Sequence, residues 1–299
     1  MSALTRFRAR ASRTRLRAPL AWLRNLGFDS NDVFLASYPR SGNTMLRFML
    51  AEALSGAPSS FETIQRLVPE VGVHGNASSL LPPSGRLIKT HEPYCTRYRR
   101  AIYIVRDVRD VMLSSFARET ALDVLHIRSL DDYVRPFVQG KMTRFGSWQR
   151  HVNGWMNSEL SRSGNLLVLR FEEMREDLEG SVARCLEFLG KKVDPFVVHA
   201  AVRNNSLERM RAKEDTATTL PKSPGEEGRW VGKGSIGGWR RKLTHSQLDT
   251  VDEFAGDILT RLGYPSGRST TQKNTPTNAV WDRKEYTRKE DRATTASNS

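Results

Sequence analysis

The chain has 299 residues, of which 38% are hydrophobic, and a formal net charge of +14. This length fits one or two domains, and the apolar content is sufficient for a real core. The two cysteines, Cys95 and Cys185, are far apart and lack metal-ligand spacing, which argues against a disulfide scaffold and favours a reducing, cytoplasmic compartment. No apolar run approaches the ~20 residues of a transmembrane helix.

The positive charge is concentrated at the flanks. Residues 1–28 contain seven arginines and no acidic residue, and residues 266–299 are polar and rich in Thr and Ser. We expect a basic, flexible N-terminal segment (1–28), one domain (29–265) and a disordered C-terminal tail (266–299). The N-terminal segment leaves open a contact with an anionic membrane or a polyanion, an amphipathic surface helix or an organelle transit peptide. We expect no specific nucleic-acid partner, since the core is much less basic.

The first predicted strand covers Val33 to Ala36, and an amphipathic helix follows from Met45 until Gly56 stops it. The tight loop between them would direct backbone N–H groups and a helix N-terminus at one spot, which suits a phosphate. Arg40 adds charge and forked donors. A Walker loop would need Gly at 37 and Lys at 43, but the chain has Ser and Asn there. The loop is therefore a phosphate loop of another kind or only a tight turn.

The remaining elements alternate between short apolar strands and helices. Strands are predicted at 86–91, 101–105 and 166–169. Helices are predicted at 108–120, twice within 129–162 with a break near Gly140, and at 178–189, 194–204 and 248–262, the last capped by Thr244 or Ser246; 57–84 and 216–238 read as loops. The alternation predicts an α/β fold with three αβα layers around a parallel sheet. Ligands bind such sheets beyond the carboxyl ends of the strands.

Four separated segments resemble the cytosolic-type sulfotransferase family, which has a P-loop-like fold. Residues 38–44 (YPRSGNT) are similar to its 5′-phosphosulfate loop, and Lys89-Thr90-His91 matches its catalytic strand end. Val105 to Ser114 matches its 3′-phosphate segment, and Lys233 to Arg240 resembles its late glycine-rich loop. The resemblance implies transfer of a sulfuryl group from 3′-phosphoadenosine 5′-phosphosulfate (PAPS) to a hydroxyl or amine, with 3′,5′-adenosine bisphosphate (PAP) as product and no metal.

The resemblance also implies roles for single residues. His91 would be the general base, because imidazole titrates near neutral pH. Lys89 and Arg40 would stabilise charge on the leaving phosphate. The residues implied in PAPS binding are Arg40, Ser41, Gly42, Asn43, Thr44, Met45, Arg106, Ser114, Phe171, Ser206, Lys233 and Gly234. Core packing stays an alternative for Phe171, and His151 and Trp239 are expected to be packing residues. Asp107, Arg109 and Asp110 are expected to form surface or intra-loop pairs.

The chain departs from the family pattern at several positions. Arg40 replaces a lysine, so it keeps the charge but cannot give up a proton. Met45 replaces a tryptophan, and Phe171 replaces a tyrosine. Gly232 stands where an arginine usually binds the 3′-phosphate, and Arg229 is a candidate replacement. The dimer motif of vertebrate relatives is not intact after Trp239, which leaves a homodimer open.

Two other functions would make different demands on the sequence. A nucleotide-dependent kinase or ATPase would need a Walker lysine where Asn43 stands, and a non-catalytic polyanion-binding protein would rely on the basic flanks. Small-molecule, lipid and carbohydrate acceptors all stay open. We expect an acceptor pocket from the loops 57–83, 117–145 and 205–230, with Phe61, Tyr94, Phe137 and Trp148 as candidate apolar lining.

Overall fold

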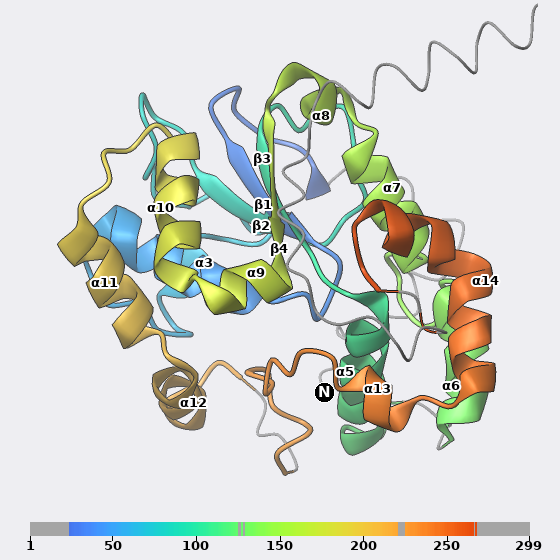
Figure 1. The fold of residues 1–299 in the computed structure, drawn as a ribbon. Helices are drawn as coiled ribbons and strands as arrows, with labels where there is room; N and C mark the ends of the chain where they lie inside the picture. Colours follow the sequence, from blue (N-terminus) through green and yellow to red (C-terminus); the bar gives the residue numbers. More distant parts are fainter. Residues whose placement is uncertain (1–23, 125–126, 128, 221–224, 266, 268–299) are drawn as a thin grey trace, which may run out of the picture.

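The computed structural model describes residues 24–124, 127, 129–220, 225–265 and 267. Its centre is a four-stranded sheet in the order β2-β1-β3-β4. The strands are β1 (Val33–Ser37), β2 (Leu87–Thr90), β3 (Ala101–Val105) and β4 (Leu166–Arg170), and all neighbours pair in parallel. Helices cover both faces of the sheet (Figure 1), so the predicted αβα architecture is confirmed.

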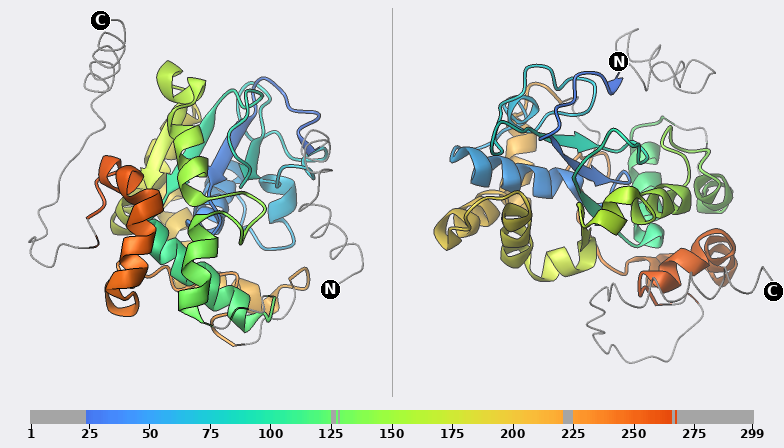
Figure 2. Two further views of the ribbon diagram at one scale, coloured as in Figure 1. Left: turned by 90° about the vertical axis from the view of Figure 1, so that its right-hand side faces the viewer. Right: turned by 90° about the horizontal axis from the view of Figure 1, so that it is seen from above.

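The two faces of the sheet have separate hydrophobic cores. Leu35, Ile102 and Ile104 face one core, and Phe34, Ala36 and Tyr103 face the other. Side chains from α3 (Asn43–Ser55), α4 (Ile64–Leu67), α10 (Leu178–Phe188), α11 (Pro195–Asn204) and α12 (Leu207–Thr216) complete the first core. The second is completed by α5 (Val108–Ala121), α6 (Leu130–Val138), α7 (Trp148–Met156) and α14 (His245–Arg261) (Figure 2).

All five residues of β1 are buried. A strand covered on both faces has no polar side to alternate with, which is why Val33 to Ala36 reads as a continuous apolar run. The predicted strands agree with the structure to within two residues at each end. Helices α5, α10 and α11 also lie where they were predicted.

Several short helices of the structure were not predicted from the sequence. Two helices were predicted within 129–162, but a third, α8 (Glu159–Ser163), begins there and is capped by the Ser158 side chain. Helices α4, α9 (Phe171–Glu176), α12 and α13 (Trp239–Lys242) were not predicted either. Helix α14 begins before the predicted Leu248, because Thr244 and Gln247 form a capping box. Side-chain caps begin α8, α12 and α14. Helices α4, α9 and α13 have no such cap and are too short to show an apolar period, so they depend on tertiary packing.

Part of the basic N-terminal segment lies on the domain. The Phe28 ring packs against Phe34 and Tyr98, and Arg24 donates hydrogen bonds to Glu92 and to the carbonyl of Val71. Most of the predicted N-terminal segment (1–23) and of the C-terminal tail (266 and 268–299) lies outside the described residues. No helix within the described ranges has the length and apolar character that crossing a membrane requires.

Candidate active site

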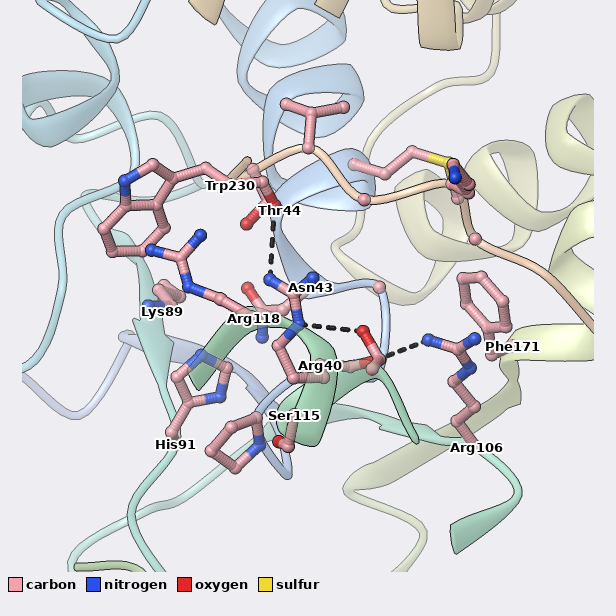
Figure 3. Close-up of a pocket in the computed structure, with 18 of the residues that line it drawn as sticks. Arg40, Asn43, Thr44, Lys89, His91, Arg106, Ser115, Arg118, Phe171 and Trp230 are labelled. Atoms are coloured by element: carbon pink, nitrogen blue, oxygen red, sulfur yellow. Dashed lines mark hydrogen bonds between the residues drawn. The ribbon is translucent and has the colours of Figure 1, made fainter. Parts of the chain in front are cut away.

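A cavity of about 460 Å³ lies at the carboxyl end of the sheet. It brings together twelve of the fourteen residues proposed from the sequence: Arg40, Gly42, Asn43, Thr44, Met45, Lys89, His91, Arg106, Ser114, Phe171, Lys233 and Gly234. Arg40 lies between Lys89 and His91 on one side and Arg106 and Phe171 on the other (Figure 3). Ser41 and Ser206 do not line the cavity.

The loop between β1 and α3 requires glycine at position 42. Gly42 has φ 92°, and a Cβ there would lie 2.5 Å from the Phe171 ring. Arg40 also adopts a left-handed conformation, with φ 68°, which costs a residue with a side chain about 1 kcal/mol or more. Helix α3 begins directly after Gly42, so its N-terminus and its partial positive charge face the cavity.

Asn43 joins this loop to the sheet. Its side-chain nitrogen donates to the carbonyl of Leu35 at 3.1 Å and to the hydroxyl of Ser37 at 3.2 Å. The amide therefore faces β1, and Asn43 contributes to the cavity as part of the loop rather than as a Walker-type charge. The Ser41 hydroxyl is also buried, and it has no hydrogen-bond partner among the described residues.

The ring of His91 is oriented by the end of β1. Its Nδ1 lies 2.8 Å from the carbonyl oxygen of Ser37. A carbonyl can only accept, so Nδ1 carries the proton and Nε2 is the basic nitrogen. Burial, reinforced by the charge of Lys89, holds the pKa of His91 well below its usual value. The imidazole is therefore neutral near pH 7 and able to accept a proton.

Lys89 forms an ion pair with Glu70, a residue that the sequence analysis missed. The Lys89 Nζ lies 3.2 Å from Glu70 Oε1. Burial lowers the pKa of Lys89, and Glu70 opposes that effect. Burial alone would raise the pKa of Glu70, but the charge of Lys89 outweighs this effect and holds that pKa below its usual value. Glu70 lies in an irregular stretch with no periodic pattern, so only its contact in the fold identifies it.

Arg40 reaches across the cavity. Its Nε donates to the Ser114 hydroxyl at 3.0 Å, and its Nη1 donates to the Trp230 carbonyl at 3.4 Å (Figure 3). Burial, followed by the charges of Arg118 and Arg106, lowers the pKa of Arg40 to about 10. The guanidinium is thus still charged near pH 7, and it is held close to other cations that an anionic ligand would neutralise.

Arg106 connects two loops at the far side of the cavity. It donates to the carbonyl oxygens of Arg40 and Ser235, both at 2.7 Å. Its guanidinium lies 4.4 Å from the centre of the Phe171 ring, and its buried Nε has no partner among the described residues. Phe171 is thus a core residue with 2% exposure that also lines the cavity.

Ser206, predicted to bind the nucleotide, has a different role. It is the N-cap of α12, and its hydroxyl accepts from the backbone N–H of Arg209. The neighbours Asn205 and Leu207 line the cavity instead. A serine that caps a helix turns its side chain toward the first turn, so the adjacent positions are the ones exposed to the ligand space.

Further charged residues around the cavity were not predicted. Arg118, Glu119, Arg144 and Arg175 line it together with Glu70. Arg118 follows Ser114 by four residues on α5, so a helical face would have indicated it. In total seven Lys or Arg and two Glu residues line the cavity. The site is strongly cationic, although much of the charge of the whole chain lies in its flanks.

Of the two alternatives predicted for the charges at the start of α5, the local pair is confirmed and the surface position is wrong. Arg109 is fully buried, pairs with Asp107 at 2.7 Å and lies 3.6 Å from the centre of the Trp239 ring. Asp110 accepts from the backbone N–H groups of Gly237 at 2.6 Å and Trp239 at 3.1 Å. The segment around α13 covers this end of α5, so its charges are internal. Trp239 is packed there, as predicted.

Arg229 does not take the place of an arginine at position 232. It pairs with Asp215 at 2.9 Å and with Glu226 at 3.6 Å, and it does not line the cavity. The Arg40 side chain fills the space beside Gly232: a Cβ at position 232 would lie 2.9 Å from Arg40 Nη2.

The aromatic lining also differs from the prediction. Phe61, Phe137 and Trp148 are buried in the two cores, and Tyr94 stacks edge-on against Trp155. Phe145 and Trp230 line the cavity instead. His151 is a packing residue as expected: it is 1% exposed, and its Nδ1 bonds to the Tyr103 hydroxyl at 2.9 Å.

The arrangement agrees with comparisons to known proteins. A family model described as Sulfotransferase domain matches residues 30–263. Sulfotransferase 2A6 of Mus musculus is 27% identical over 251 residues, which cover 79% of this chain and 86% of the relative. Sulfotransferase 2B1 of Rattus norvegicus is 29% identical over 255 residues, which cover 80% of this chain and 74% of the relative.

Solved structures share the fold. Mouse sulfotransferase SULT7A1 complexed with PAP aligns with a TM-score of 0.60 and 24% identity, over 80% of this chain and 87% of that one. Retinol dehydratase in a complex with retinol and PAP aligns with a TM-score of 0.60 and 21% identity, over 87% of this chain and 88% of that one.

Proposed function

This chain belongs to the sulfotransferase domain family, and from that premise we propose that His91, Lys89 and Arg40 carry out sulfuryl transfer to a small acceptor in the cavity. The protein is a PAPS-dependent sulfotransferase. The observation that supports these roles is that a neutral, oriented imidazole, the buried Lys89 and the partly buried Arg40 of the phosphate-type loop line one cavity.

The residues around the cavity fit PAPS, which carries a 3′-phosphate and a 5′-phosphosulfate. Seven cationic side chains against two carboxylates suit a ligand with several negative charges. The α3 N-terminus with Arg40 and Thr44 would hold the 5′ side. Arg106, whose buried Nε lacks a partner among the described residues, would hold the 3′ side with Ser114 and Lys233. When bound, PAPS supplies the activated sulfuryl group.

His91 acts as the base in this proposal. Its Nε2 takes the proton from the acceptor hydroxyl or amine, because Nδ1 already carries a proton that it donates to Ser37. The Ser37 carbonyl fixes the ring plane, so no reorganisation of the imidazole is needed during transfer.

Lys89 and Arg40 supply positive charge to the leaving phosphate. Lys89 is buried and Arg40 is partly buried, and electrostatic stabilisation is stronger in such surroundings than in bulk water. Arg40 contributes charge and two-pronged hydrogen bonds only, since a guanidinium does not act as a proton donor at neutral pH. A metal ion has no obvious ligand set here: the described residues hold no cluster of three or more His, Cys, Asp or Glu.

For the acceptor we propose a small hydroxylated molecule with an apolar part. The Phe145 ring lies 5.7 Å from the imidazole of His91, and the half-exposed Trp230 adds apolar surface. Retinol dehydratase, which shares the fold, has been solved in complexes with androsterone and with retinol.

The two free cysteines, Cys95 and Cys185, support a cytoplasmic location for the reaction.

The test is His91→Ala, with transfer followed as PAP release from PAPS over a panel of hydroxysteroid, phenol, lipid and sugar acceptors. We expect turnover to fall at least ~1000-fold, while PAP affinity, measured by calorimetry, stays within about threefold. The control is His199→Ala on α11, whose exposed ring pairs only with Glu179 among its described contacts. Near-normal turnover of His91→Ala would refute the assignment of the base.

A further inference from the structure

Lys89 stands in an environment that is unfavourable for a positive charge. Its side chain is only 10% exposed. Arg47 on α3 and Arg144 before α7 add like charge, and His91 on the same strand end is neutral. Among the described residues, Glu70 is the carboxylate within ion-pair distance of Lys89.

The fold fixes Glu70 beside Lys89. The two residues form a parallel β-bridge along the free edge of β2. The backbone N–H of Lys89 donates to the Pro69 carbonyl at 2.7 Å, and that of Val71 donates to the Lys89 carbonyl at 2.9 Å. The pairing of the two charges therefore rests on backbone hydrogen bonds and not only on flexible side chains.

A buried arginine holds the segment that leads into Glu70. Arg47 Nε donates to the Val68 carbonyl at 2.7 Å, and its Nη2 donates to Gln65 Oε1 at 3.2 Å. The Gln65 side chain in turn accepts from the backbone N–H of Glu70 at 3.3 Å. Helix α3, which begins at the phosphate-type loop, thus also sets the position of Glu70.

We propose that Glu70 is a positioning residue for sulfuryl transfer, which keeps the Lys89 ammonium charged and aimed into the cavity. This inference rests on the proposed role of Lys89. Without the carboxylate, burial and the charges of Arg47 and Arg144 would act on Lys89 unopposed. Lys89 would then lose its proton at a lower pH, and the transfer would lose positive charge where the leaving oxygen develops negative charge.

The direct test measures the protonation of Lys89 by brief acetylation with acetic anhydride across a pH series. The Lys89 peptide is quantified by mass spectrometry in the wild type, Glu70→Gln and Glu70→Asp. We expect the pH of half-maximal labelling to fall by about one unit in Glu70→Gln and by less in Glu70→Asp, which keeps a carboxylate. The control is Glu253→Gln, which removes a carboxylate from an exposed pair with Arg135 and should leave the midpoint unchanged.

Steady-state kinetics then connect this charge to the transfer. The alkaline limb of kcat should move to lower pH by the same amount in Glu70→Gln, with a loss of about fivefold at the pH where Lys89 is half-deprotonated in the wild type. An unchanged labelling midpoint in Glu70→Gln and Glu70→Asp overturns the inference. A lowered midpoint with an unchanged kcat limb supports the coupling of Glu70 to Lys89 and refutes instead the proposed role of Lys89 in transfer.

Discussion

Two sides of the cavity are built in different ways. On one side, Arg40, Lys89 and His91 follow or end buried parallel strands, and Asn43 and Ser37 connect them to the sheet. On the other side, the loop 225–238 has no regular structure. Its backbone is held by side chains from elsewhere: Glu214 accepts from Trp230 and Val231, Arg118 donates to Gly228, and Arg106 donates to Ser235.

The two sides therefore differ in role: one holds the residues proposed for the transfer, and the other encloses the ligand space. Lys89 lies within β2, and the proposed base His91 and the second cation Arg40 lie just beyond the ends of β2 and β1, so the sheet sets their positions. The loop that borders the ligand space depends on individual charged contacts, each of which can be broken alone. We therefore expect changes on the sheet side to affect folding or turnover, and changes on the loop side to affect mainly ligand affinity.

The largest effect is expected for Gly42→Ala on the sheet side. The new Cβ would meet the Phe171 ring at 2.5 Å, on a backbone with φ 92°. Overpacking and the left-handed conformation together should lower the free energy of unfolding by about 3 kcal/mol, as measured by urea denaturation. Gly56→Ala, at the other end of α3, has φ 69° but no atom within 4 Å of its Cβ, and should cost about 1 kcal/mol. Equal costs would show that the Phe171 contact is unimportant.

Asp110→Asn should show the loop side's dependence on a single carboxylate. Asp110 accepts the N–H groups of Gly237 and Trp239, and such charge-assisted bonds contribute about 2 kcal/mol. We expect KM for PAPS to rise ~10-fold with a smaller change in kcat. Asp194→Asn, at the N-cap of α11, should leave KM unchanged. A pure loss of kcat for Asp110→Asn would place this contact with the chemistry instead.

The pH dependence of kcat/KM should reflect the burial of His91 on the sheet side of the cavity. Burial first, and then Lys89, depress the pKa of His91. A depressed pKa keeps Nε2 unprotonated at lower pH, so the acid limb of kcat/KM should lie well below pH 6.5. We expect more than half of the pH 7.5 activity to remain at about pH 6. A limb at or above pH 6.5 would mean that the ring is solvated during turnover.

The smallest effect is expected for Glu214→Gln. Its carboxylate accepts from Trp230 at 2.8 Å and from Val231 at 3.0 Å, and glutamine keeps one of these acceptors. KM for PAPS should rise by about threefold and Tm should change by about 1 °C or less. Glu208→Gln, in the first turn of the same helix, serves as the control. A large fall in Tm would show that the loop is part of the cooperative core.

The comparison also explains how much the sequence could predict. Buried parallel strands leave an apolar signature, and the motifs at their ends gave Lys89, His91 and Arg106 directly. Glu70 and Asn205 were missed, because their places depend on edge pairing and on a helix cap one residue away. Arg118 was missed although the predicted helix places it on the same face as Ser114. The local pairing of Asp107 with Arg109 was predicted, but the burial of these charges was not, since only the fold shows that the segment around α13 covers them. The sequence alone could not decide whether Arg229 replaces an arginine at position 232, because only the structure shows that the Arg40 side chain fills the space beside Gly232.

The contact between Arg40 and Gly232 restricts the order in which these two positions can change. A Cβ at 232 would lie 2.9 Å from Arg40 Nη2, the far end of a flexible side chain, so Gly232→Arg should displace the Arg40 guanidinium from its place and set a like charge beside it. The shorter, unforked Lys at position 40 would vacate that space, so Arg40→Lys should come first, and the double variant should outperform Gly232→Arg alone. An evolving or engineered lineage could therefore exchange this pair of residues by one mutational path more readily than by the reverse path.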